Sequence, residues 1–151
     1  MRQASFRSRA FSLVEVVLAL GIAAFALVAI VGMLPVGLKL ASESDEESRA
    51  VNILTQLAAD RRASITTAAS EIYRIPALVG SVTATNTFAV GEDGTYLDQD
   101  FAKARYRVNY SLIPPRANSG DPWLLWLRAG WPAQATNPSA SVESLNTIPI
   151  L

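Results

Sequence analysis

The sequence lacks two residue types that carry much of protein chemistry, because its 151 residues include no cysteine and no histidine. Without cysteine there can be no disulfide framework, thiolate metal site or cysteine nucleophile. Without histidine there is no imidazole ligand, and the most common general base near neutral pH is missing. An enzyme would depend on carboxylates, lysine, tyrosine or serine, and no two acids stand in a recognisable catalytic motif. We therefore expect no enzymatic activity.

Charge is also scarce, and its placement is uneven. The 13 basic and 13 acidic side chains cancel, so no overall basic field predicts binding to nucleic acid. The first ten residues carry three arginines and no acid, whereas residues 16–34 carry no charge. As a helix, residues 11–34 would span roughly 36 Å, enough for the hydrocarbon core of a bilayer. Arginines before this segment and acids after it predict a cytoplasmic N-terminus.

Glu15 is the one charge within residues 11–34. It helps to distinguish the possible functions of this apolar segment. A cleaved secretory signal has an apolar run of about 7–15 residues before a small-x-small site. Here the run is longer, and residues 33–40 offer no convincing site. A plain membrane anchor explains the length and the flanking charges. It does not explain a carboxylate that costs on the order of 2–3 kcal/mol in lipid.

A third explanation comes from residues 10–15, Ala-Phe-Ser-Leu-Val-Glu, with the apolar stretch that follows them. Residues 7–40 together resemble the N-terminal signal of type IV prepilins. The resemblance implies that prepilin peptidase removes a basic leader, residues 1–10, by cutting between Ala10 and Phe11. It also implies that the new Phe11 amine is N-methylated. The family usually has glycine before the cut, so Ala10 is a departure that leaves the efficiency of cleavage open.

Glu15 has a physical role within this resemblance. A buried ammonium at Phe11 is costly without a partner and much less costly with one. The resemblance implies that Glu15 pairs with the Phe11 amine of a neighbouring subunit and so sets the axial register of assembly. The alternative is a carboxylate at headgroup level without a partner. Further along, Pro35 removes an intrahelical hydrogen bond, which predicts a kink or a locally melted turn.

Residues 35–63 are predicted to continue the helix as an amphipathic segment, because apolar residues recur there at i, i+3 and i+4. The members of this face are Ala50, Val51, Ile53, Leu54, Leu57, Ala58 and Arg61. Glu43 and Glu47 are expected to form a solvated acidic collar, with pairing to Arg49 or to a neighbouring subunit as the alternative. Residues 64–80 predict a loop with one short strand at 71–75.

After this loop the hydrophobic period changes to two, which predicts strands. The runs with this period are 87–90 and 95–97 around an Asp-Gly turn, 104–113, 123–131 and 142–148. The first two predict a hairpin. In the next run, Tyr106, Val108, Tyr110 and Leu112 share one face. Residues 64–151 are thus expected to form a small antiparallel sheet of three to five strands on the C-terminal half of one long helix, an α+β fold.

This arrangement is also that of the pilins. The strand order and the ending Arg-Ala-Gly-Trp-Pro at 128–132 resemble the type IV pilus modification proteins and the minor pseudopilins of type II secretion. More narrowly, they resemble the prepilin-type proteins of the Verru_Chthon cassette. The disulfide-closed loop of many major pilins is missing, which favours a minor or initiating subunit. The resemblance implies a structural subunit of a type IV pilus-like or type II secretion pseudopilus-like filament.

Location and partners follow from the same resemblance. The chain would cross the inner membrane once through residues 11–34, with residues 64–151 in the periplasm, before it enters a periplasmic or surface filament. Its partners would be membrane lipid, prepilin peptidase and the N-terminal helices of other pilin-like subunits. The inner-membrane assembly platform and its ATPase would act indirectly, since the chain itself carries no P-loop.

Four acids are candidates for binding a metal ion. Glu92, Asp93, Asp98 and Asp100 supply oxygen ligands of the kind that calcium prefers. The spacing of a calcium loop is missing, however, and Glu-Asp-Gly is the ordinary chemistry of a turn. We therefore predict no metal and no cofactor.

Three tryptophans are candidates for a ligand-stacking surface. Strand parity places Trp123 and Trp131 on one face and Trp126 on the other, which favours core positions for most of them. A stacking surface would support a different function, that of a membrane-anchored periplasmic binding module that does not polymerise.

Overall fold

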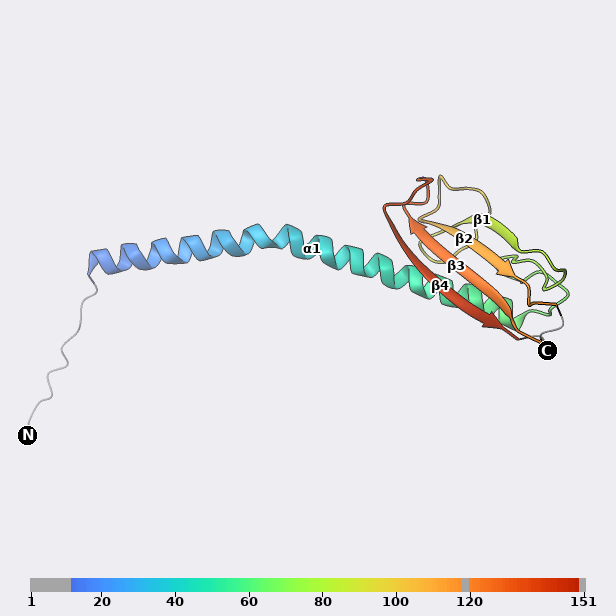
Figure 1. Ribbon diagram of the computed structural model, residues 1–151. Coiled ribbons are helices and arrows are strands. Elements are labelled where there is room, and N and C mark those ends of the chain that lie inside the picture. The colour runs from blue at the N-terminus through green and yellow to red at the C-terminus, as the bar shows by residue number, and fades with distance from the viewer. Residues whose placement is uncertain (1–11, 118–119, 150–151) are drawn as a thin grey trace, which may run out of the picture. The chain divides into compact units, whose positions relative to one another are not determined.

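The computed structural model describes residues 12–117 and 120–149. Along these residues one helix is followed by four strands: α1 (Leu13–Ala63), β1 (Ala84–Val90), β2 (Tyr106–Ile113), β3 (Trp123–Trp131) and β4 (Ala140–Ile148) (Figure 1). The chain divides into two units, one up to Glu43 and one from Ser44 onward. The first contains the apolar part of α1, and the second contains the rest of α1 and these strands.

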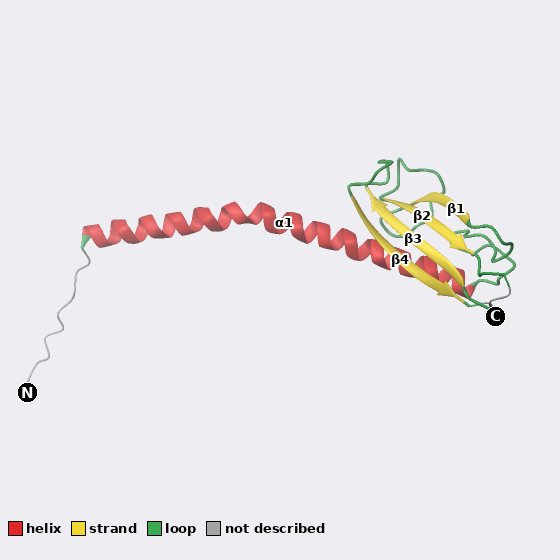
Figure 2. Ribbon diagram, in the orientation of Figure 1, coloured by secondary structure: helices red, strands yellow, loops and turns green. Residues whose placement is uncertain are grey.

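The strands form one antiparallel sheet in the order β1-β2-β3-β4 (Figure 2). Burial alternates along the two central strands, because successive side chains point to opposite faces. The buried side chains of β2 are Tyr106, Val108, Tyr110 and Leu112, as predicted. They meet the C-terminal part of α1 in a single core. The predicted α+β fold, a long N-terminal helix packed on a small antiparallel sheet, is confirmed.

Within the second unit, α1 turns one side toward the sheet. The side chains that it buries are Ala50, Ile53, Leu54, Leu57, Ala58, Asp60 and Arg61. Their spacing of three and four residues is the one that the sequence predicts. Val51 departs from the prediction, since 44% of it is exposed. Val51 is rotated by about 100° around the helix axis from Ala50, so its side chain lies outside the buried stripe.

The short strand predicted at 71–75 is wrong, because residues 71–73 form a turn and residues 74–75 belong to no strand. The Asp60 carboxylate accepts hydrogen bonds from the amides of Ile72 and Tyr73 at 3.3 and 3.0 Å. Arg74 has a φ of 55°, in the left-handed region. A backbone that is bonded to a side chain and turned in this way cannot join a sheet.

The predicted hairpin is present only as a single bridge between Val90 and Tyr96. The partner of β1 is β2 instead, over the full seven-residue register from Ala84–Leu112 to Val90–Tyr106. This pairing places the ring of Phe88 beside Tyr110, with ring centroids 6.1 Å apart. Burial of aromatic side chains in the core favours the distant partner over the adjacent one.

Pro35 lies inside α1, and the helix continues through it. The melted turn that the sequence allowed is therefore not formed at this position. The kink stays a prediction.

Leu57 tests whether the buried stripe of α1 holds the sheet unit together. Leu57 is fully buried, so Leu57→Ala should lower the free energy of unfolding by about 2–5 kcal/mol through lost burial and a cavity. Val51→Ala, on the half-exposed side of the same helix, should cost less than about 1 kcal/mol. Denaturant unfolding of the detergent-solubilised protein, followed by tryptophan fluorescence, measures both. Equal losses would contradict the packing described here.

Candidate functional site

The first unit presents an apolar helix without cover. Every described residue from 12 to 43 is exposed, including Phe25 at 79% and Met33 at 75%. By length and composition this part of α1 could span a membrane or act as a signal anchor. A contiguous apolar surface of this extent is unfavourable in water and marks contact with lipid or protein.

Glu15 lies in the first turn of this helix. The carbonyl oxygen of Ser12 starts α1 by accepting the amides of Glu15 and Val16 at 3.0 and 3.2 Å. A carboxylate is favoured there, since the helix N-terminus carries a partial positive charge. Among the described residues none pairs with the Glu15 side chain, which is exposed. The predicted cleavage and methylation positions, Ala10 and Phe11, lie outside the described residues.

Gly21 leaves an apolar hollow on one side of the same helix. Nothing lies within 4 Å of the place where a side chain on Gly21 would begin. The hollow is bounded by Val14, Val17, Leu18 and Phe25 among others. Positions 14, 17, 18 and 21 follow the i, i+3, i+4, i+7 pattern that forms the four-sided hole for a side chain of a packed helix. This surface is therefore suited to contact with another helix.

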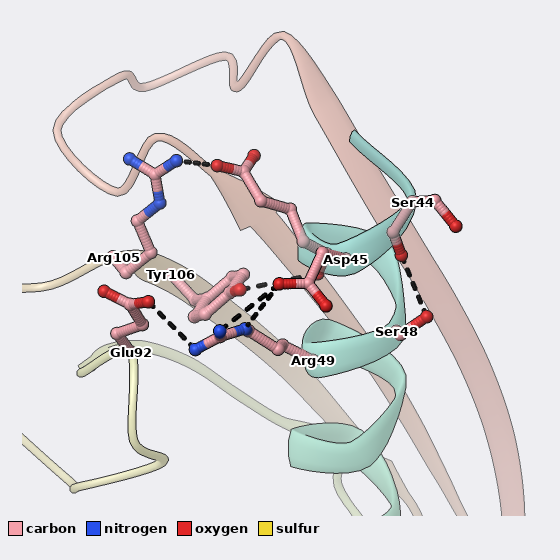
Figure 3. Close-up of polar contacts among 8 residues, drawn as sticks. Ser44, Asp45, Ser48, Arg49, Glu92, Arg105 and Tyr106 are labelled. Atoms are coloured by element: carbon pink, nitrogen blue, oxygen red, sulfur yellow. Dashed lines mark hydrogen bonds and ion pairs between the residues drawn. The ribbon is translucent and has the colours of Figure 1, made fainter. Parts of the chain in front are cut away.

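Arg49 joins α1 to the turn after β1. Its Nη1 donates to Glu92 Oε1 at 2.9 Å, and its Nε and Nη2 donate to Asp45 Oδ2 at 3.4 and 3.3 Å (Figure 3). The three side chains are about half exposed or more. Ion pairs this exposed contribute little to stability individually, but they fix which part of the helix faces the turn.

Glu46 makes a second attachment one turn earlier. Its carboxylate pairs with the guanidinium of Arg105, and its carbonyl oxygen accepts a hydrogen bond from the Tyr106 hydroxyl at 3.4 Å.

Glu43 and Glu47, which the sequence predicts as a solvated collar, are both exposed, and Arg49 pairs with Asp45 and Glu92 instead of with either of them. Glu43 lies 3.8 Å from Lys39 on the same helix.

Arg61 is the polar centre of the sheet unit. It is fully buried, and its guanidinium is surrounded by backbone carbonyls of the loop that follows α1. The acceptors are the oxygens of Ser64, Ile65, Ala68, Ile75 and Pro76, at 2.6 to 3.2 Å. Burial lowers the pKa of Arg61, and the neighbouring Asp60 opposes this effect. One side chain thus organises the whole loop, which explains why an arginine occupies a core position.

The four acids considered for calcium have separate partners. Asp93 accepts the amide and hydroxyl of Thr95 at 3.1 and 2.7 Å, and these bonds lower the pKa of Asp93. Asp100 lies 3.1 Å from Lys103, which lowers its pKa. Asp98 accepts the hydroxyl of Tyr96 at 3.0 Å. In the part of the chain that the structure describes, no three acidic side chains gather into a ligand set.

The tryptophans do not share a surface. Trp123 and Trp131 are buried in the core, where Trp131 makes an edge contact with Tyr106 at 6.0 Å between ring centroids. Trp126 lies on the opposite face and is half-buried. The stacking surface considered from the sequence is therefore reduced to one side chain.

Sequence reasoning missed the attachments at Glu46 and Arg49, because their partners lie 43 to 60 residues away in the chain. It placed Arg61 on the apolar face without finding its role. The sequence did contain an indication of this role, because an arginine on the face of a helix that is buried needs partners for its charge. No protein-family model, curated protein or solved structure matches this chain.

Arg61→Met should unfold the loop and weaken the whole sheet unit. The substitution removes five hydrogen bonds, of which one is buried and four are part-buried, so we expect a loss of about 3–5 kcal/mol in the free energy of unfolding. Arg62→Met is the matched control, because the adjacent Arg62 is exposed and should cost less than about 1 kcal/mol. Hydrogen exchange at the amides of Tyr73 and Ile75 should accelerate only in the Arg61 variant. Unchanged exchange there would contradict the assigned role.

The Arg49–Glu92 pair should show a small, salt-sensitive coupling. A double-mutant cycle with Arg49→Gln and Glu92→Gln should give about 0.2–1 kcal/mol at low salt. Near 1 M salt the coupling should approach zero, because exposed charges are screened. Denaturant unfolding measures each variant. A coupling that persists at high salt would show that the two residues interact by something other than charge.

Proposed function

We propose that this chain is a structural subunit of a pilin-like filament, held in the inner membrane through residues 11–34 before assembly. The observation that carries the proposal is Glu15. A single carboxylate stands in the first turn of an otherwise apolar exposed helix, and none of the described residues pairs with it. A plain anchor has no need of this charge, whereas assembly through paired charges does.

The proposed chemistry follows from the cost of burying charge. Removal of residues 1–10 leaves an ammonium at Phe11. When apolar helices bundle, this ammonium and Glu15 both leave water, and each is tolerated only with an opposite charge beside it. Pairing between the Phe11 amine of one subunit and Glu15 of the next satisfies both. A helix displaced along the bundle axis loses the pair, so the charges define the register.

In the proposed filament, the exposed apolar surface of α1 holds neighbouring subunits together, and the sheet unit forms the exterior. The hollow at Gly21 allows a second helix to approach closely. The sheet unit has its own core, so it stays folded whether the preceding helix lies in lipid or in a bundle. We assign the subunit to a type IV pilus-like or type II secretion pseudopilus-like filament, as a minor or initiating member. Energy for assembly comes from partner proteins.

The alternative is a membrane-anchored binding module that does not polymerise. It needs a binding surface on the periplasmic part of the chain. Burial of Trp123 and Trp131 removes two of the three aromatic side chains that this alternative relied on. We therefore prefer the filament subunit.

Intact mass and N-terminal sequencing of the membrane-extracted protein test the processing step. We expect a chain that begins at Phe11 and is heavier by one methyl group. A chain that begins at Met1 would indicate a plain anchor. Cleavage beyond Leu34 would indicate a secretory signal and would leave Glu15 without a role in the mature protein.

Glu15→Ala separates assembly from anchoring. The variant should reach the membrane normally but lose assembly by roughly a hundredfold or more, because a broken buried pair costs about 3–5 kcal/mol. Glu43→Ala, which removes a carboxylate from the exposed part of the same helix, should assemble as the unmodified protein does. Filament yield and membrane fractionation give the two readouts. Equal yields from the two variants would exclude the proposed role of Glu15.

A further inference from the structure

β4 is an edge strand with an open outer side. It is the last strand of the sheet and pairs with β3. At the other edge, Ala89 of β1 exchanges backbone hydrogen bonds with residues 97–98, so its polar groups face away from β2. Because these groups alternate along antiparallel strands, the three registers give the direction of those in β4. The residues that turn theirs away from β3 are Ser141, Glu143, Leu145 and Thr147. Among the described residues, only Arg62 bonds any of these groups.

A groove lies beside this open edge, between α1 and β4 (Figure 2). Its volume is about 130 Å³, roughly that of four water molecules in the liquid. Val51 and Leu54 line it from the helix, and Val142 and Ser144 line it from the strand. The helix-side side chains of β4 are half-buried up to Asn146, whereas those of β2 are buried. The groove therefore has room for an aliphatic side chain from outside the sheet.

Arg62 supplies the positive charge of this groove. Its Nε and Nη2 donate to the Thr147 carbonyl oxygen and to Asn146 Oδ1, both at 3.2 Å. Neither acceptor is charged, and none of the described residues bonds Nη1. Glu143 also borders the groove, but its carboxylate lies 3.5 Å from Arg128. The exposed guanidinium of Arg62 thus keeps donors for a carboxylate that a partner brings.

Strand parity determines what an added strand presents to the groove. Side chains opposite Val142, Ser144 and Asn146 point to the helix-side face, because directly opposite residues share a face. A side chain opposite Asn146 lies beside the Arg62 guanidinium, and one opposite Ser144 lies over the groove. A fitting strand therefore has a carboxylate at one position and apolar side chains two and four positions away.

This chain cannot supply that strand from a second copy. An acid followed by apolar residues two and four positions later occurs at Glu15, Glu71, Asp100 and Asp121. The first of these segments lies in α1. Each of the other three buries one or both of its apolar side chains. The occupant that the groove fits is therefore a different protein.

We propose that β4 binds an extended segment of a partner protein, which adds to the sheet as one more antiparallel strand. Ser141, Glu143 and Leu145 exchange main-chain hydrogen bonds with it. Antiparallel pairing is the more stable of the two directions. The partner segment begins with an acidic residue that pairs with Arg62, and its next helix-side residue is apolar and fills the groove. The pairing ends there, since Arg62 holds the Thr147 carbonyl oxygen.

A synthetic peptide tests the inference directly. The probe is acetyl-Thr-Glu-Thr-Val-Thr-Val-Thr-Lys(fluorescein)-amide, titrated with the full-length protein in detergent and followed by fluorescence anisotropy. We expect saturable binding. A peptide of the same composition with the order Thr-Glu-Val-Thr-Thr-Val-Thr should bind about tenfold more weakly, because one valine moves to the other face. Equal binding of the two peptides, or no saturation up to about 1 mM, would overturn the proposal.

Arg62→Met tests the charge pair. The variant should bind the glutamate peptide about tenfold more weakly, because a charge-assisted hydrogen bond is lost. Its binding of the same peptide with glutamine in place of glutamate should change less than about twofold. Equal losses with both peptides would contradict a carboxylate at this position.

Leu145→Pro tests the main-chain pairing. Proline at this position removes an outward N–H and no bond to β3, so the fold should survive. The variant should lose binding of the probe at an unchanged unfolding midpoint, whereas Leu145→Thr should keep it. Binding that survives Leu145→Pro would show that the peptide does not add to β4.

Sedimentation of the protein without peptide identifies a competing occupant. We expect Leu145→Pro to leave the sedimenting mass unchanged. An oligomer that this substitution dissolves, and that the probe displaces, would assign the edge to a second copy and overturn the proposal. The inference is independent of the filament, because a chain that begins at Met1 should bind the probe as a processed chain does.

Discussion

The packing of one stripe of α1 on the sheet is the interaction on which the rest of the folded unit depends. The stripe runs from Glu46 through Leu54 and Leu57 to Arg61, at intervals of three and four residues. Its apolar middle forms the core, and its charged ends make the long-range attachments. Glu46 holds the start of β2 through Arg105 and Tyr106. The same helical geometry therefore positions the core, the loop and the sheet together.

The sequence predicts those parts of the fold whose cause is a local period. Burial along β2 and the stripe of α1 follow from alternation and from helical spacing, and both are confirmed. The failures have a common physical origin, which is competition from a distant group. The strand predicted at 71–75 loses its backbone amides to Asp60. The hairpin after β1 loses to β2, because that pairing buries Phe88 in the aromatic core.

The residues of the candidate site also differ in whether the local sequence predicts them or distant groups determine them. Glu15 is conspicuous in sequence because one charge interrupts an apolar run, and its exposure needs no tertiary information. The partners of Arg49 and Arg61 could not be predicted, since they are set by how loops return to the helix. Arg61 shows the limit most clearly. Helical spacing predicts its position in the apolar stripe, but the five carbonyls that accept from its Nη1 and Nη2 belong to a loop without regular structure.

The two edges of the sheet differ in how far other residues cover them. Open edge strands are a liability for a monomeric protein, and folded proteins commonly cover or charge them. Here Gln99 and residues 97–98 cover the second half of β1, whereas β4 carries one charged side chain, Glu143, and lies beside an incompletely filled groove. A chain that needed only to stay monomeric would gain from closing both edges. Covering the second half of one edge while a groove stays beside the other makes the two edges of the sheet chemically different.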